Sequence, residues 1–225
     1  MDALTYLRAK FGIPAHATSP IEIPHVKRDP DLCRLFHLLG YQVGVEVGVE
    51  QGLFSEALCR ENPGVRLYCV DAWRAYRGYR DHVDQEKLNG FYEATQRRLA
   101  PYRATLIREF SLDAVKDFQD GELDFVYIDG NHSFENVAMD IAAWSRKVRV
   151  GGIIAGHDYA KYQLPNMIHV VQAVNGYIDA YEIDPWFLLG KQSKTEDPDR
   201  DKARSWFWVH DPKPIRPRGQ KAIKQ

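Results

Sequence analysis

The stretch GVEVGVEQGLFSEAL, residues 44–58, decides which fold this chain can adopt. It opens within a short apolar run, residues 43–47, and continues into a pattern in which apolar side chains recur every three or four positions. The first pattern is typical of a buried strand and the second of an amphipathic helix. Gly48 and Gly52 stand between them, where the backbone must turn sharply. The stretch therefore predicts a strand, a tight glycine turn and a helix in succession.

The same alternation of apolar runs and helical patterns continues along the chain. Further strands are expected at residues 66–70, 104–108, 123–128 and 152–156. Near-continuous apolar strands that alternate with helices indicate a parallel sheet covered on both faces. Two later apolar runs, residues 182–190 and 205–211, flank a polar loop and predict an antiparallel pair. We therefore expect an α/β, Rossmann-like fold: a mostly parallel seven-stranded sheet with helices on both faces and a final antiparallel hairpin.

The remaining segments divide the chain into one domain with two flanks. Residues 1–28 combine a short helical pattern with a segment that contains several prolines, and they are expected to form an irregular arm that lies over the domain. Residues 29–210 contain the strand and helix patterns and form the predicted domain. Residues 211–225 are basic and poor in apolar side chains, which is typical of a flexible tail.

Composition narrows the range of partners. Thirty basic residues stand against 31 acidic ones, for a net charge of −1, so we expect no nucleic-acid partner. No apolar run approaches the roughly 18 to 20 residues that span a bilayer, and the N-terminus lacks a signal-peptide pattern. The three cysteines are scattered, with no C-x-x-C pair, and are expected to be buried, reduced thiols. We therefore expect a cytoplasmic protein with no membrane partner, and assembly into a homo-oligomer stays open.

In a parallel α/β sheet, ligands bind beyond the carboxyl ends of the strands, at the point where the strand order reverses. Gly48 and Gly52 lie beyond the first of these ends, where a residue without a Cβ lets the backbone come close to a ligand. Such a turn is equally typical of an ordinary strand-to-helix connection. Asp71 favours a ligand, because it ends the next strand, nineteen positions after Gly52. A carboxylate there can accept hydrogen bonds from both hydroxyls of a ribose, which indicates a nucleoside-containing ligand.

Glu50 bears on which nucleoside binds. A dinucleotide would place its pyrophosphate on free N–H groups at the N-terminus of the following helix, where the Glu50 carboxylate would repel it. S-adenosylmethionine has a ribose, an adenine and a cationic sulfonium, but no phosphate. The turn is therefore compatible with S-adenosylmethionine and unfavourable for a nicotinamide dinucleotide.

These motifs resemble those of the class I S-adenosylmethionine-dependent methyltransferases. The matching features are the E-x-G-x-x-x-G turn at Glu46, Gly48 and Gly52, the acid Asp71, and the segments LDFVYIDGNHSFENVAMDIAAW (123–144) and VRVGGIIAGHDY (148–159). These two segments, together with the stretch IEIPHVKRD (21–29), are most similar to the branch of small bacterial O-methyltransferase-like domains. The resemblance covers about residues 21–160.

The resemblance implies that S-adenosylmethionine is the cofactor and that several strand ends share its site. The residues that it assigns to the cofactor are Glu46, Gly48, Gly52, Asp71, Phe110, Ser111 and Asp129. In this assignment Asp71 binds the ribose hydroxyls, while Phe110 and Ser111 flank the adenine. The alternative for Phe110 is an ordinary core aromatic at a strand end.

Two strand ends carry the groups that bear on the reaction. If the usual strand order holds, the strands that end at Asp129 and at His157-Asp158 are neighbours, about 5 Å apart. Some related O-methyltransferases bind magnesium with acids at these ends, and by that resemblance Asp129, His157 and Asp158 would be metal ligands. Imidazole suits zinc, iron or nickel better than magnesium. Without a metal, His132 or His157 would act as the general base beside Asp129, and purely structural roles are the third interpretation.

Two neighbouring features have open interpretations. Residues 73–103 form a long excursion rich in tyrosine and arginine, which is either a lid or substrate wall, or a helix that packs its aromatics against the sheet edge. On the helix expected after Asp129, Glu135 and Asp140 are expected to be solvated or capping residues.

The predicted function is S-adenosylmethionine-dependent methylation of an oxygen on a small molecule, such as a sugar or secondary metabolite. Oxygen is favoured over nitrogen because the acids and histidines can activate a hydroxyl, and because the chain lacks the N/D-P-P-Y/F tetrapeptide of amino-methylating relatives. The alternatives are a cofactor-binding module without turnover and a metal-dependent hydroxylase or hydrolase on the same scaffold. A nicotinamide dehydrogenase is disfavoured by the glycine spacing.

Overall fold

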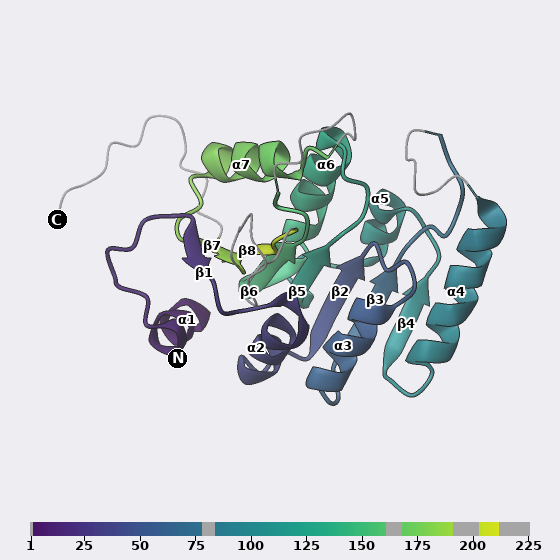
Figure 1. The fold of residues 1–225 in the computed structure, drawn as a ribbon, viewed down its shortest axis with the longest axis horizontal. Coiled ribbons are helices and arrows are strands. Elements are labelled where there is room, and N and C mark those ends of the chain that lie inside the picture. Colours follow the sequence, from purple (N-terminus) through teal and green to yellow (C-terminus); the bar gives the residue numbers. More distant parts are fainter. Residues whose placement is uncertain (1, 78–83, 161–167, 191–202, 212–225) are drawn as a thin grey trace.

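The computed structural model describes residues 2–77, 84–160, 168–190 and 203–211. In this part of the chain one eight-stranded sheet carries helices on both of its faces (Figure 1). The strand order is β1-β7-β8-β6-β5-β2-β3-β4, and all neighbours are parallel except the two pairs that involve β8. The strands are β1 (Ile21–Ile23), β2 (Val43–Val47), β3 (Arg66–Val70), β4 (Ala104–Ile107), β5 (Leu123–Ile128), β6 (Val148–Gly156), β7 (Trp186–Leu189) and β8 (Trp206–Val209).

Helices alternate with the strands as the sequence predicts, which confirms the Rossmann-like α/β fold. They are α1 (Ala3–Phe11), α2 (Cys33–Leu38), α3 (Leu53–Glu61), α4 (Gln85–Leu99), α5 (Ser111–Ala114), α6 (Phe134–Ser145) and α7 (Val170–Tyr181). Helices α2, α3 and α4 cover one face of the sheet, and α5, α6 and α7 cover the other (Figure 1). A π-helical turn, η1 (Arg28–Leu32), leads into α2, and a 3-10 turn, η2 (Val115–Asp117), follows α5.

The central strands are buried on both faces, because their side chains alternate between two hydrophobic clusters. In β5, Phe125 and Tyr127 join the cluster that includes α2 and α3, whereas Val126 and Ile128 join the cluster that includes α6 and α7. All four side chains are buried. A strand covered on both faces needs apolar residues at consecutive positions, which is why these strands have near-continuous apolar sequences.

The sheet has one strand more than the seven that the sequence predicts. Strand β1 pairs in parallel with β7, with Ile21 opposite Phe187 and Ile23 opposite Leu189. The N-terminal arm therefore contains the expected short helix, α1, and also an edge strand that was not expected. Strand β1 has only three residues, buried, exposed and buried in turn, and so short an alternation is not recognisable between flanking prolines.

The closing pair of strands is antiparallel, as predicted. Trp186 of β7 lies opposite Trp208 of β8, and β8 also pairs in antiparallel fashion with β6. The basic tail predicted for residues 211–225 lies outside the described residues from position 212 onward.

Much of the excursion between β3 and β4 is the helix α4. Trp73, the first residue of the excursion, is fully buried. The centre of its ring lies 4.9 Å from that of Tyr92 on α4. The Arg108 guanidinium lies over the Tyr92 ring, 4.7 Å from its centre. Packing of aromatics against the sheet edge therefore accounts for the described part of the excursion. A lid stays a prediction, since residues 78–83 lie outside the described residues.

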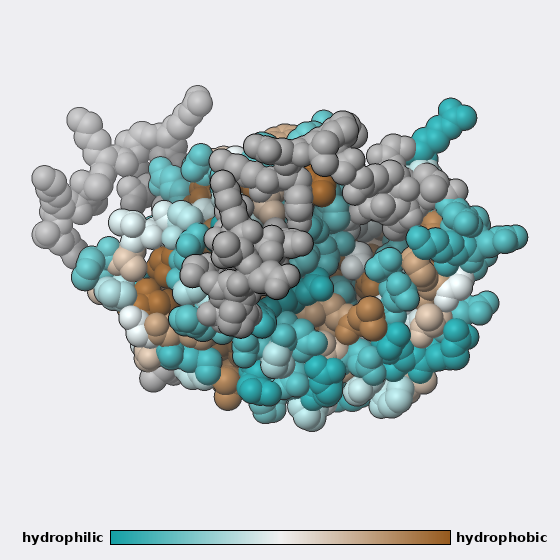
Figure 2. Space-filling view, viewed as in Figure 1, coloured by the Kyte–Doolittle hydropathy of each residue, from teal (hydrophilic) through white to brown (hydrophobic). Residues whose placement is uncertain are grey.

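The face of the molecule drawn in Figure 2 has few large apolar areas among the described residues. Figure 2 shows a mainly hydrophilic face with small, separate hydrophobic patches. Among the described residues, none of the helices has the length and apolarity needed to cross a membrane. The cysteines, Cys33, Cys59 and Cys69, are free and buried, as predicted.

Candidate active site

The glycine turn lies between the carboxyl ends of β2 and β5, where the strand order reverses. Gly48 has a φ of +87°, a left-handed conformation that residues with a Cβ rarely adopt. A Cβ there would also run into the backbone carbonyl of Asp129 at the end of β5. Position 48 therefore requires glycine for two reasons, its backbone conformation and the lack of space for a Cβ. Gly52, just before α3, has a different task, because a Cβ on it would lie 2.9 Å from the Thr95 side chain of α4.

Asp71 ties this turn to the end of β3. Its Oδ2 accepts hydrogen bonds from the backbone N–H groups of Val49 and Glu50, both at 3.0 Å, and its Oδ1 accepts one from Trp73 N–H at 2.8 Å. The side chain is buried, and the three bonds offset the cost of burying a carboxylate. Asp71 thus has a structural task that its sequence position does not reveal. One lone pair of Oδ1 remains for a ligand.

Glu46 lies beneath the turn as a buried acid. It is 2% exposed, and the Ser55 hydroxyl of α3 donates a hydrogen bond to its Oε2. Burial raises the pKa of Glu46 to about 8, against a smaller lowering by that hydrogen bond. At neutral pH the side chain is therefore mostly protonated and adds little negative charge to the site.

Replacing Glu46 by glutamine should remove a pH dependence of stability. A carboxyl group with a raised folded-state pKa stabilises the fold fully below its ordinary pKa of 4.5, and this contribution disappears as the pH rises to about 8. Glutamine is neutral throughout. From pH 5 to pH 8 the free energy of unfolding should therefore fall by a few kcal/mol more in the natural protein, at about 1.4 kcal/mol per pKa unit.

Urea titrations at the two pH values measure this difference. Glu135→Gln, on the exposed side of α6, is the matched control and should leave the pH dependence unchanged. The same pH dependence in Glu46→Gln and the natural protein would contradict a neutral Glu46.

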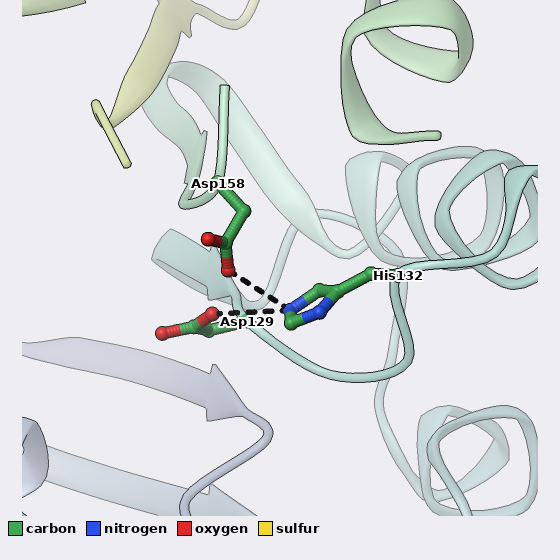
Figure 3. Close-up of side chains that lie close together, drawn as sticks. All are labelled: Asp129, His132 and Asp158. Atoms are coloured by element: carbon green, nitrogen blue, oxygen red, sulfur yellow. Dashed lines mark ion pairs between the residues drawn. The ribbon is translucent and has the colours of Figure 1, made fainter. Parts of the chain in front are cut away.

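At the neighbouring ends of β5 and β6, two histidines lie close to two aspartates. His132 Nε2 is 3.0 Å from Asp158 Oδ2 and 3.6 Å from Asp129 Oδ1 (Figure 3). His157 Nδ1 is 3.5 Å from Asp158 Oδ2 and 3.7 Å from Asp129 Oδ1. The structure therefore brings together the four side chains that the sequence places at these strand ends.

The two carboxylates determine the charges in this cluster. Burial works to lower the pKa of His132, but hydrogen bonds to Asp129 and Asp158 and their negative charges outweigh it and raise the pKa to about 10. Burial works to raise the pKa of Asp158, but the two histidines hold it below its usual range. At neutral pH His132 is therefore an imidazolium that faces two carboxylates.

The cluster also meets the geometric requirement for a divalent cation. One ligand atom from each of Asp129, His132 and Asp158 lies within 4.8 Å of the others, so all three could bind one ion. His132 takes the place in this set that the sequence pattern suggests for His157, which lies close by. Two carboxylate oxygens and one imidazole nitrogen form a mixed donor set that suits zinc, iron or manganese. Binding such an ion would require His132 to lose its proton.

Arg28 is a site residue that the sequence patterns did not single out. It belongs to η1, and its Nη1 lies 2.9 Å from Asp129 Oδ2. The guanidinium also lies over the Phe54 ring, 4.7 Å from its centre. Asp129 therefore has a cationic partner at each of its two oxygens. One sequence signal for Arg28 was available. Arg28 lies in the part of the predicted arm that the resemblance to methyltransferases also covers.

A cavity of about 540 Å³ connects the glycine turn with Asp129 and His132, whereas His157 and Asp158 are not among its lining residues. Its volume is in the range typical of small-molecule sites. Both Arg28 and His132 line it. The predicted cofactor residues that line it are Glu46, Gly48, Asp71, Phe110, Ser111 and Asp129. Gly52 packs against Thr95 and supports the turn.

Aromatic and polar side chains line another part of the cavity. Tyr76 meets Phe110 edge to face, with ring centres 5.4 Å apart, and Asn131 donates a hydrogen bond to the Tyr76 hydroxyl at 3.0 Å. Phe110 is 37% exposed, so it is not the core aromatic of the alternative interpretation. The two rings therefore give this part of the cavity wall an aromatic surface.

Asp140 of α6 lies inside the protein, which corrects its expected place on the solvated surface. It is 4% exposed and lines the cavity. The reason is helical spacing, because position 140 follows Val137 by three residues and precedes Trp144 by four, and both of these are buried. Asp140 Oδ1 accepts a hydrogen bond from Ser111 Oγ at 2.5 Å, and Ser111 Oγ accepts one from Trp144 Nε1 at 2.8 Å.

Comparisons with known proteins agree with this geometry. Residues 45–159 match the family described as "Methyltransferase domain". The chain is also 24% identical over 135 residues to the uncharacterized protein y4gI of Sinorhizobium fredii. That match spans 55% of this chain but only 14% of the relative, so the chain corresponds to a small part of that protein.

Solved structures share the fold at low sequence identity. The O-methyltransferase from Bacillus cereus in complex with SAH is 15% identical, with a TM-score of 0.55 over 92% of this chain and 88% of that one. Cofactor-bound Rv0187 from MTB is 17% identical, with a TM-score of 0.56 over 93% and 90%. The N-methyltransferase NodS from Bradyrhizobium japonicum is 11% identical, with a TM-score of 0.53 over 80% and 92%.

These three similarities are similarities of fold. The fold does not decide which atom accepts the methyl group, because it is shared by proteins named for oxygen methylation and for nitrogen methylation. The family match is more specific, since it covers half of the chain from β2 to the end of the Asp129 and Asp158 cluster. The chain therefore belongs to the methyltransferase domain family, and it shares its fold with methyltransferases of solved structure.

Proposed function

We propose that this chain methylates a hydroxyl oxygen of a small molecule, such as a sugar or a secondary metabolite. The observation that carries the proposal is the cluster of Asp129, His132, His157 and Asp158 beside the cavity. A hydroxyl becomes a good nucleophile only when it loses its proton, and closely spaced carboxylates and imidazoles are groups that can remove it or hold a cation that acidifies it.

The cavity offers a place for each part of the cofactor. S-adenosylmethionine would supply an electrophilic methyl group on a cationic sulfonium. Asp71 has a remaining lone pair for a ribose hydroxyl, and Phe110 offers an apolar wall for the adenine. Gly48 lets the ligand approach the backbone of the turn. Arg28, which lines the cavity, offers a positive charge to the carboxylate of the amino-acid part.

Two accounts of hydroxyl activation use the same cluster. In the first, Asp129, His132 and Asp158 hold a divalent cation, which would lower the pKa of the acceptor hydroxyl. In the second, His132 stays protonated and His157 takes the proton as general base, an effect typically worth about 10²- to 10⁴-fold. In both, alignment of the oxygen with the methyl carbon and the sulfur supplies a large part of the rate.

The test of the proposed function follows the methyl group. The purified chain is incubated with S-adenosylmethionine labelled with ¹³C in the methyl group and with matched panels of hydroxyl and amine compounds, and products are identified by NMR. We expect label on oxygen. Transfer to amines alone would contradict the proposed acceptor. Binding of S-adenosylhomocysteine without transfer to any compound would favour a binding module.

Chelation separates the two accounts of activation. If the cluster holds a catalytic cation, dialysis against a chelator should lower turnover at least about tenfold, because the hydroxyl loses its Lewis acid, and added zinc, iron or manganese should restore it. Elemental analysis gives a readout that does not depend on activity: Asp158→Asn should retain less metal than the natural protein. Full turnover in chelator, with no metal retained, would leave the general base as the mechanism.

The described part of the structure offers no observation in favour of a binding module without turnover. A binding module without turnover predicts that Asp129 faces solvent, whereas its side chain is 19% exposed and ion-paired with Arg28.

For the location, the buried free thiols of the three cysteines support a reducing compartment, and we propose the cytoplasm. The charge balance supports a small-molecule acceptor over a nucleic acid.

A further inference from the structure

A second cavity, of about 620 Å³, adjoins the cofactor cavity between α4 and the segment that follows β4. Its volume is also in the range of small-molecule sites. Ala72 and Phe110 line both cavities. Asp129 and His132 line the cofactor cavity but not the second one. A ligand in the second cavity would therefore lie apart from the groups that are proposed to act on the acceptor hydroxyl.

Arg108 lines the second cavity with a guanidinium that the protein holds in place. Its Nη2 donates hydrogen bonds to the Trp73 carbonyl at 3.0 Å and to Asn89 Oδ1 at 2.5 Å, and the group lies over the Tyr92 ring. In the described part of the chain, Nε and Nη1 have no hydrogen-bond acceptor. These two nitrogens therefore keep their N–H donors for a ligand.

The amide side chains around Arg108 belong to one hydrogen-bonded network. Gln85 Nε2 donates to the Trp73 carbonyl and to Asn89 Oδ1, both at 3.0 Å, and Gln85 Oε1 accepts from the Ala75 N–H at 2.9 Å. Both Gln85 and Asn89 line the cavity. The network connects α4 with the start of the excursion, so the polar wall of the cavity is formed before a ligand binds. Such preorganisation lowers the free-energy cost of binding.

The ion pairs around the second cavity leave its two arginines without a carboxylate. Arg74 and Arg108 are exposed and line the cavity, and no ion pair among the described residues includes either of them. The acids that line it are Glu109 and Asp113. Asp113 pairs with Lys116 at 2.7 Å, and a hydrogen bond to Asp113, together with the charges of both acids, raises the pKa of Lys116. The two acids therefore have a cation of their own.

We propose that the second cavity binds a small organic anion, with its carboxylate or phosphate group on Arg108 and Arg74 and its apolar part on the Phe110 ring. Hydrogen bonds from a guanidinium to either anionic group are strong, because both partners are charged. Phe110 is 37% exposed and supplies an apolar surface beside these charges. The site is separate from the reacting groups and does not rest on the proposed function.

The experiment titrates the full chain with benzoate, phenyl phosphate and the uncharged benzyl alcohol, at constant ionic strength. Shifts of the arginine Nε–H signals and of the Phe110 backbone N–H signal in ¹H–¹⁵N NMR spectra measure the affinity. At least one of the two anions should bind at least about tenfold more tightly than the alcohol, which has no charge. The anion that binds more tightly identifies the natural ligand as a carboxylate or a phosphate.

Three variants test the two arginines. Arg108→Gln should weaken binding of the tighter anion at least about tenfold, and Arg74→Gln at least about threefold. Arg97→Gln is the matched control, because Arg97 is an exposed arginine of α4 that pairs with Glu93 and does not line the cavity. Arg74 has no hydrogen bond or ion pair among the described residues, so Arg74→Gln loses no contact of the fold. It remains a test if Arg108→Gln fails to fold.

Several results would overturn the second site. They are no saturable binding of either anion, equal affinities for the anions and benzyl alcohol, and an unchanged affinity in Arg74→Gln. An equal loss in Arg97→Gln would also overturn it, since the anion would then respond only to the net charge of the chain. The titrations contain no S-adenosylmethionine, so their outcome is independent of the proposed methyl transfer.

Discussion

Asparagine in place of Asp129 should lower methyl transfer at least about 100-fold while the dissociation constant for S-adenosylhomocysteine changes less than about threefold. Asp129 is the group that His132, His157 and Arg28 all approach, at 3.6, 3.7 and 2.9 Å. Asparagine has the same shape but no charge. Asparagine would therefore remove the electrostatic attraction that orients the side chains of His132, His157 and Arg28. It would also weaken a metal site that includes Asp129.

Turnover with saturating S-adenosylmethionine and calorimetric titration of S-adenosylhomocysteine measure the two effects separately. Asp117→Asn, an exposed acid of η2, is the matched control and should change neither. Arg28→Gln provides a second comparison, because it leaves the carboxylate in place and removes its 2.9 Å partner. Normal turnover in Asp129→Asn would remove Asp129 from the mechanism, and an equal loss in turnover and affinity would place it in cofactor binding.

Alanine in place of Asp71 should weaken binding of S-adenosylhomocysteine by more than about tenfold and also lower the melting temperature. The carboxylate accepts from Val49, Glu50 and Trp73, and truncation would leave three backbone N–H groups of the turn without their acceptor. Each buried group left without a partner costs about 1–3 kcal/mol, and for a chain of this size each kcal/mol lowers the melting temperature by about 2–4 °C.

Calorimetry with and without ligand distinguishes the two roles of Asp71. Asp71→Asn keeps one oxygen acceptor, so we expect it to recover part of the stability but less of the ribose affinity. Unchanged ligand affinity in Asp71→Ala would refute the ribose assignment. An unchanged melting temperature in the absence of ligand would refute the role of Asp71 in holding the turn.

The central strands could be predicted from the sequence to the residue. The apolar runs at 43–47, 66–70 and 123–128 coincide with β2, β3 and β5, because strands covered on both faces must be apolar throughout. Strand β1 could not be predicted in this way. Its three residues gain their partner only when β7 folds beside them, more than 160 positions later in the chain.

The residues of the site also fall into those that the sequence could predict and those that it could not. Gly48 and Asp71 could be named from their positions, because strand ends of a parallel sheet meet at one edge. Arg28 could not, because it meets Asp129 across 101 positions of the chain. The predicted surface position of Asp140 is wrong, although its spacing from Val137 and Trp144 on the buried face of α6 is visible in the sequence.

The sequence by itself determined the order of strands and helices, the glycine turn and the set of acids and histidines at the strand ends. These follow from periodicity and from local backbone requirements, which act between residues near one another in the chain. Only the tertiary structure decided that His132 faces both Asp129 and Asp158, that Glu46 is neutral and that Arg28 joins the cluster. Charge states and pairings depend on burial and on distances between remote segments, and these exist only after the sheet has assembled.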